Sequence, residues 1–164
     1  FMLDYRGYGK STGSITSQAQ LLADVELAYQ QVLATYDESQ VVIVGYSLGT
    51  GPATWLAARH QPKLLLLHAP YYSIADMAAH TVKVWPLLPN FLLRYPMPTN
   101  EFIRQVSAPI VLVHGDHDNL IPYNSSLRLK ALLKPGDQLI TIRGGGHNGL
   151  TETPQYQQVL PNIL

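Results

Sequence analysis

The chain contains no cysteine, and this absence removes several chemistries at once. Thiolate metal sites, cysteine nucleophiles and disulfides are excluded, while the cellular compartment is left open. Charge is also scarce: charged residues make up 13% of the sequence, with 11 basic residues against 11 acidic ones. A neutral chain carries no electrostatic signature for nucleic acid or for an anionic membrane, so neither is expected as a partner.

The sequence also lacks a long apolar run. None approaches the roughly 18 residues that span a bilayer, so we expect no transmembrane segment. No charged start followed by an apolar stretch indicates a signal peptide, which favours the cytoplasm. The first residue is Phe1 rather than an initiator methionine, and we therefore expect the true N-terminus to be missing.

The residues that are present are typical of one globular domain spanning residues 1–164. Hydrophobic residues make up 46% of the chain, enough for a sizeable core. Short buried strands alternate with helices, which predicts an α/β fold with a mainly parallel sheet. Phe1–Asp4 is expected to be the end of a strand. The other expected strands are Val41–Tyr46, Leu64–Leu67, Pro109–His114 and Gln138–Arg143. The expected helices are one that begins at a Ser17–Gln20 capping box, then Leu48–His60, Ser125–Leu133 and a terminal helix from Pro154.

The segment Gly45-Tyr46-Ser47-Leu48-Gly49 is a G-x-S-x-G motif between a predicted strand and a predicted helix. A nucleophile at such a corner takes a strained backbone conformation that exposes its hydroxyl above the sheet. Glycines on both sides remove side chains that would collide with the strand and the helix. The five-residue pattern alone also fits a glycine-rich turn with a serine cap, but its strand–turn–helix context favours a nucleophile.

A serine nucleophile needs a base, and the base needs an orienting acid. Of the six histidines, His147 alone directly follows a predicted strand, in the glycine-rich loop "IRGGGHNG". Asp116 and Asp118 follow the strand that ends at His114. The chain order is therefore serine, aspartate, histidine, which is the order of α/β-hydrolases.

Four motifs together resemble a known family. The segments "FMLDYRGYGKSTG", "GYSLG", "HGDHDNLIP" and "GGGHN" are similar to the serine α/β-hydrolases of the BEM46-like and serine-aminopeptidase-like type. The resemblance implies an α/β-hydrolase fold with helices on both faces of the sheet. It also implies roles for particular residues: Ser47 as nucleophile, His147 as general base, Asp118 as orienting acid and the backbone N–H of Leu48 as an oxyanion donor.

The resemblance ranks the other candidate residues as well. The motif H-G-x-x-D carries its acid at the last position, so Asp116 is the weaker candidate. His114, in the same motif, is expected to be structural rather than catalytic. Asp76, which follows the strand at Leu64–Leu67, is an alternative acid whose surroundings match no motif.

The chain departs from this family at its start. In the family the fold opens with strands, and a loop after the third strand supplies the second oxyanion donor. We expect this sequence to begin within the fourth strand, without that loop. In the family the third strand lies between the fourth and the fifth. We therefore expect Phe1–Asp4 to shift and pair with Val41–Tyr46, or another chain to insert a strand, with self-association and weak activity as consequences.

Residues 71–105 correspond to the position of a cap over the active site in the family. The segment is rich in aromatic and leucine residues interrupted by prolines, including Trp85, Pro86, Phe91 and Tyr95. Such a lining suits an acyl or aryl group, and helices packing on the core are the equally weighted alternative.

The sequence thus predicts a serine hydrolase that cleaves an ester, thioester or small amide through an acyl-enzyme. The expected partner is a small acyl substrate, and no metal or organic cofactor is implied. An acyltransferase that uses the same three residues is the near alternative. A catalytically impaired α/β-hydrolase-like binding module is the alternative from a different class.

Overall fold

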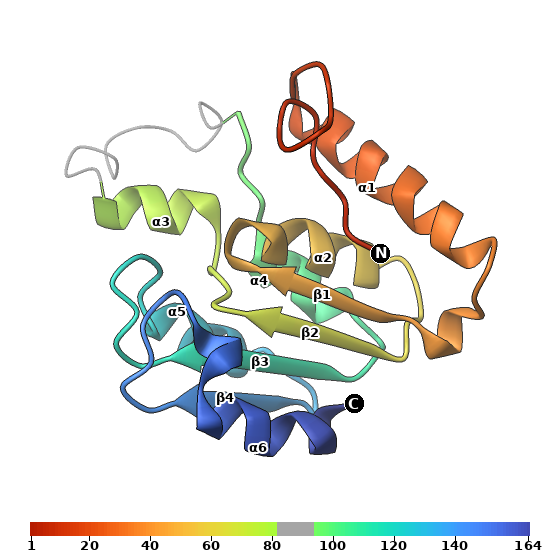
Figure 1. Cartoon of the computed structure of the whole chain (residues 1–164). Coiled ribbons are helices and arrows are strands. Elements are labelled where there is room, and N and C mark those ends of the chain that lie inside the picture. The colour runs from red at the N-terminus through yellow and green to blue at the C-terminus, as the bar shows by residue number, and fades with distance from the viewer. Residues whose placement is uncertain (82–93) are drawn as a thin grey trace.

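Four parallel strands form one sheet in the order in which they occur along the chain (Figure 1). The strands are β1 (Val42–Tyr46), β2 (Leu64–His68), β3 (Ile110–Gly115) and β4 (Gln138–Ile142). The computed structural model describes residues 1–81 and 94–164. Each strand pairs with the next in parallel, so that Gly45 lies opposite Leu67 and Gly115 lies opposite Ile142. These four predicted strands are confirmed to within about one residue at each end.

Helices connect the strands, as parallel neighbours require a crossover. The helix α1 (Gln18–Leu33) and a short 3₁₀ turn, η1 (Glu38–Gln40), precede β1. Between β1 and β2 lie η2 (Ser47–Gly49) and α2 (Thr50–Ala57), and between β2 and β3 lie α3 (Ile74–Thr81), α4 (Thr99–Phe102) and η5 (Ile103–Gln105). The helix α5 (Asn124–Lys130) joins β3 to β4, and η6 (Leu150–Glu152) and α6 (Pro154–Ile163) follow β4.

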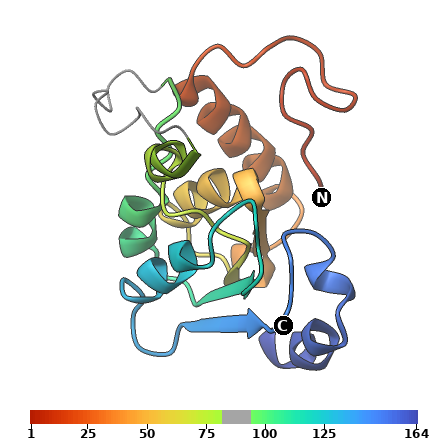
Figure 2. The ribbon, with the colours of Figure 1, turned by 90° about the vertical axis from the view of Figure 1, so that its left-hand side faces the viewer.

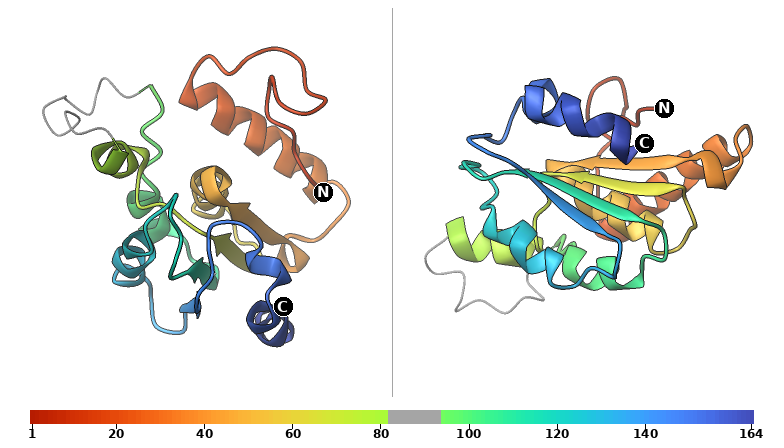
Figure 3. Two further views of the ribbon diagram at one scale, coloured as in Figure 1. Left: turned by 60° about the vertical axis from the view of Figure 1, so that its left-hand side comes forward. Right: turned by 90° about the horizontal axis from the view of Figure 1, so that it is seen from below.

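The sheet is covered on both faces, as the resemblance implies. Leu65 and Leu67 of β2 pack into one core with residues of α1, α2 and α5, including Val25, Leu56 and Leu129. The alternate residues of β2, Leu64 and Leu66, pack into a second core with Tyr156 of α6. Figure 3 (right) has α6 on one side of the sheet and α2 and α5 on the other. All five residues of β2 are buried, because both of its faces are covered.

The start of α1 follows the predicted capping box with one difference. The Ser17 hydroxyl accepts a hydrogen bond from the Gln20 N–H at 3.1 Å. The Gln20 amide oxygen, however, accepts from the N–H and the hydroxyl of Thr16, at 2.8 and 2.9 Å. The glutamine therefore satisfies the residue before the cap rather than the cap itself.

The prediction that Phe1–Asp4 is the end of a strand is wrong for this structure. The segment forms no strand, and 86% of Phe1 and 98% of Met2 are exposed. It runs beside α1, outside the sheet (Figures 1 and 2). It also does not shift to pair with β1: a groove of about 770 Å³, lined by Leu3, Tyr29 and Val44 among others, lies between them. The outer edge of β1 pairs with no strand within residues 1–81 and 94–164, and Phe1–Asp4 stays outside the sheet.

The described part of residues 71–105 packs on the core. Tyr71 is fully buried in a cluster with Leu21, Met97 and Ile121. The aromatic and leucine residues at positions 85–93, on which the expectation of a cap depends, lie outside the described residues. Within the described part of the chain, none of the helices has both the length and the apolar character needed to cross a bilayer.

Candidate active site

Ser47 occupies a sharp corner at the carboxyl end of β1. Its φ of 52° lies in the left-handed region, which a non-glycine residue adopts at a cost of about 1–3 kcal/mol. The chain enters the 3₁₀ turn η2 at Ser47 and continues directly into α2. Leu48 is the second residue of η2, and the N–H groups of a first helical turn have no intrahelical acceptor.

The two glycines of the motif have different reasons to be there. A Cβ at Gly45 would lie 2.8 Å from the Ala53 Cβ and 2.9 Å from the Gly49 carbonyl oxygen, so no side chain fits. A Cβ at Gly49 would meet only the Tyr5 hydroxyl, at 3.7 Å, which is ordinary contact. The prediction that both flanking glycines prevent a collision therefore holds for Gly45 and is wrong for Gly49.

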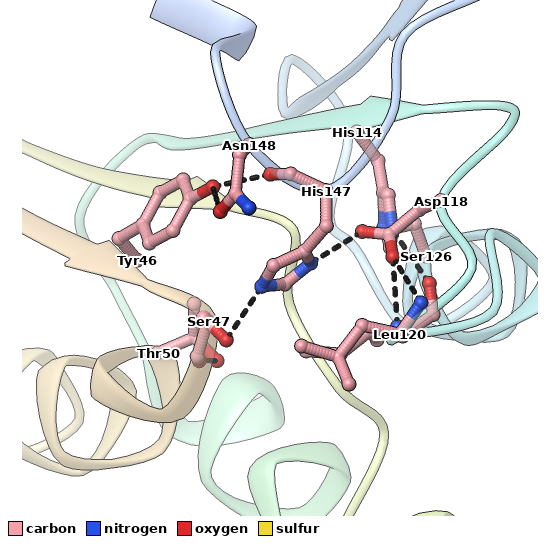
Figure 4. Close-up of polar contacts among 10 residues, drawn as sticks. Tyr46, Ser47, Thr50, His114, Asp118, Leu120, Ser126, His147 and Asn148 are labelled. Carbon is pink, nitrogen blue, oxygen red and sulfur yellow. Dashed lines mark hydrogen bonds and ion pairs between the residues drawn. The ribbon is translucent and has the colours of Figure 1, made fainter.

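A continuous chain of hydrogen bonds joins Ser47, His147 and Asp118 (Figure 4). The His147 Nε2 lies 3.0 Å from the Ser47 Oγ, and the His147 Nδ1 lies 2.7 Å from the Asp118 Oδ2. An ionised carboxylate can only accept, so the proton of a neutral His147 is assigned to Nδ1 and Nε2 is left to accept from the serine. Ser47 and His147 are partly buried, whereas the Asp118 side chain is fully buried.

The Asp118 carboxylate stays charged in spite of its burial. Burial raises its pKa, but the hydrogen bonds from His147 and from the backbone N–H groups of Ile121 and Leu120 outweigh this and hold the pKa below its usual value. Both N–H groups donate to the Asp118 Oδ1 at 2.8 Å. The group that faces His147 is therefore a carboxylate, as an orienting acid must be.

The structure separates the other candidate acids from His147. The Asp116 Oδ1 accepts the Gly144 N–H at 2.6 Å, so Asp116 holds the turn that leads to His147 without contacting its ring. Asp76 of α3 accepts from the Arg128 guanidinium at 2.5 Å. Of the three candidate acids, only Asp118 reaches the histidine.

Two residues that shape the site carried no assigned role in the sequence prediction. A Cβ at Gly115 would lie 2.2 Å from the Gly145 carbonyl oxygen, so this glycine allows the His147 loop to approach β3. The Tyr46 hydroxyl donates a hydrogen bond to the His147 backbone carbonyl, and the two rings lie 5.6 Å apart (Figure 4). The glycines in "HGD" and "RGGGH" were a signal for the role of Gly115, and no sequence pattern indicated the contact made by Tyr46.

Metal ligands do not gather in the described ranges. Across residues 1–81 and 94–164, the histidine, aspartate and glutamate side chains form no group of three or more that could hold a metal ion.

This arrangement defines a class of protein. A parallel sheet with a serine on a strand-to-helix corner, and an aspartate and a histidine after later strands, is the α/β-hydrolase arrangement. A family model described as the alpha/beta hydrolase fold matches residues 1–86, just over half of the chain. The chain belongs to the alpha/beta hydrolase fold family.

Individual relatives agree with this assignment. The chain is 30% identical to the human alpha/beta hydrolase domain-containing protein 17B, over all of this chain and 55% of that protein. It is 28% identical to the mouse alpha/beta hydrolase domain-containing protein 17C, over all of this chain and 50% of that protein. The chain thus spans about half the length of the curated relatives it matches.

Solved structures share the fold at low sequence identity. An esterase from Pyrococcus furiosus matches with a TM-score of 0.76 and 16% identity, over 98% of this chain and 67% of that one. An alpha-beta serine hydrolase homologue from Coxiella burnetii matches with a TM-score of 0.70 and 18% identity, over 98% and 66%. At these identities the likeness extends to the fold alone.

The contrast between the two glycines gives a stability test. Gly45→Ala should lower the free energy of unfolding by about 1–3 kcal/mol, because the new methyl group overpacks the corner. Gly49→Ala should change it by less than about 1 kcal/mol in either direction, because its φ of −67° suits alanine and its side is open. Urea unfolding followed by circular dichroism measures both, and equal effects would contradict the account of the corner.

Proposed function

We propose that this chain forms the catalytic part of a serine hydrolase that cleaves an ester, thioester or small amide through an acyl-enzyme. The observation that carries the proposal is the hydrogen-bonded chain from the Ser47 Oγ through His147 to Asp118. Ser47 attacks the substrate carbonyl while His147 Nε2 takes its proton, and Asp118 stabilises the imidazolium that forms. The Leu48 N–H stabilises the negative charge on the substrate oxygen.

Release of the acyl group completes the reaction. His147 first returns the proton to the leaving group, and it then takes a proton from the water that attacks the acyl-serine. An acyltransferase would use an alcohol or amine at this second step in place of water. A binding module without catalysis would leave the same hydrogen bonds intact but form no acyl-enzyme.

We expect Ser47→Ala to abolish hydrolysis of a p-nitrophenyl ester, because no acyl-enzyme can form. The melting temperature should change by only a few degrees, since Ser47 is only partly buried and serine and alanine would both adopt the same strained φ. Release of p-nitrophenol and a thermal melt of the same preparation check both outcomes. Retention of the wild-type rate by this variant would remove Ser47 as the nucleophile.

The two aspartates of the loop after β3 make a matched pair. Asp118→Asn should lower kcat by about 10⁴-fold, because an amide favours the wrong imidazole tautomer. Asp116→Asn should lower kcat by less than about tenfold, because its remaining amide oxygen can still accept the Gly144 N–H. Steady-state kinetics on both variants provide the test, and the reverse ranking would assign the acid to Asp116.

We further propose that a second copy of the chain is a partner, through the outer edge of β1. In the described residues this edge pairs with no strand, and 57% of Val44 is exposed beside the groove. Such an edge is a template for pairing with another strand. The chain should therefore associate as its concentration rises from about 10 to 500 μM, within the range where exposed edges drive association.

A charge at this edge should prevent that association. Val44→Lys places a lysine on the edge strand, whereas Leu27→Lys is a control on α1, where 64% of the leucine is exposed outside the groove lining. Sedimentation velocity should find less association for Val44→Lys and no change for Leu27→Lys. A monomeric wild-type chain, or equal effects of the two lysines, would contradict the proposal.

A further inference from the structure

The Asp118 carboxylate receives a fourth hydrogen bond that the reaction does not use directly. Its Oδ1 accepts from two backbone N–H groups, and its Oδ2 is shared between two histidines. The His147 Nδ1 lies 2.7 Å from Oδ2, and the His114 Nε2 lies 3.2 Å from the same atom. His114 is the penultimate residue of β3, and its side chain lies beside the Asp118 carboxylate (Figure 4).

The surroundings of His114 fix its protonation. The ring is fully buried, and burial lowers its pKa although the Asp118 charge acts in the opposite direction. The Nε2 also lies 3.0 Å from the Ile121 carbonyl oxygen, which can only accept, so this nitrogen carries a proton. The His114 Nδ1 is 2.6 Å from the Ser126 Oγ, and in a neutral ring with its proton on Nε2 it accepts a hydrogen bond from the serine hydroxyl.

The other groups around His114 leave this assignment unchanged. His147 faces His114 across Asp118, and a protonated His147 disfavours a positive charge on His114. The Tyr123 ring lies edge-on, with centroids 5.7 Å apart. A neutral ring with its proton on Nε2 is therefore the form that satisfies Ser126, Ile121 and Asp118 together.

We propose that His114 is a positioning residue for the site, and that Ser126 sets its tautomer. Its Nε2–H holds the Asp118 Oδ2 in line with His147 and stabilises part of the carboxylate charge. This inference rests on the proposed function for its catalytic meaning, but the hydrogen bonds can be tested without turnover. Without the His114 Nε2–H, the negative charge of Asp118 is less stabilised and attracts a protonated His147 more strongly. The protonated form of His147 would then persist to higher pH.

The test compares His114→Leu, which removes the donor, with His114→Gln, whose amide N–H₂ can restore it. Leu112→Ala is the control, because Leu112 is equally buried on β3 but makes no side-chain hydrogen bond. Each variant is followed by nuclear magnetic resonance titration of the His147 ring and by the pH dependence of kcat/KM on a p-nitrophenyl ester. Ser126→Ala retains the histidine and serves if His114→Leu does not fold.

In His114→Leu, the His147 signals and the acid limb of the rate profile should both move to higher pH, by about half a unit. We expect kcat to fall by about tenfold with little change in KM, because the carboxylate loses one of its supports. His114→Gln should bring both the pH dependence and kcat most of the way back to their wild-type values. Ser126→Ala should change both quantities in the same direction as His114→Leu but by less. Leu112→Ala should lower stability and change neither quantity.

The outcomes separate this inference from the proposed function. If the wild-type chain turns over no ester but the His147 signals shift as described, the function proposal fails and the role of His114 stands. Unchanged His147 signals in both His114→Leu and Ser126→Ala would overturn the role of His114, whatever the activity. An equal shift in Leu112→Ala would also overturn it, because a general loosening of β3 would then be the cause.

Discussion

The hydrogen bond from His147 to Asp118 is the contact on which the rest of the site depends. It joins two loops that leave neighbouring parallel strands, and its geometry follows from how closely those loops approach. Gly115 has no side chain and admits the Gly145 carbonyl, while the His117 N–H donates to that same carbonyl at 2.9 Å. These contacts bring the end of β4 close to the end of β3, and His147 then reaches both Asp118 and Ser47, which directly follows β1.

The buried carboxylate has a physical consequence for the fold around it. An ionised group with no exposed side-chain surface costs several kcal/mol unless it is hydrogen-bonded. Asp118 meets this condition with two backbone donors and two imidazoles. The loop Asp118–Ile121 therefore has to wrap around the carboxylate, and this conformation in turn presents the Ile121 carbonyl to His114. Site and local fold are two consequences of the same buried charge.

The paired strands and the corner at Ser47 could be predicted from the sequence, because short local patterns of residues specify them. The four paired strands are short runs of buried residues, and the nucleophile corner follows from the spacing of Gly45 and Ser47 between a strand and a helix. The choice of Asp118 over Asp116 came from a motif rather than from spacing. Three features depend on contacts between residues far apart in the sequence, which no local pattern contains. They are the contact of Tyr46 with His147, the hydrogen bond of His114 to Asp118, and the open space beside Gly49. The strand expected at Phe1–Asp4 was wrong because extended residues become a strand only with a partner, and the neighbour is not specified by the residues themselves.

The central claim is that Ser47 is a nucleophile activated by His147. Its most direct test is reaction of the folded chain with a fluorophosphonate, followed by peptide mapping of the modified residue by mass spectrometry. The account predicts one modification per chain, on Ser47, formed faster as the pH rises from about 5 to 8, because only a neutral imidazole can accept the serine proton. Modification of a different residue, or no modification of Ser47 under conditions that label a known serine hydrolase, would contradict it.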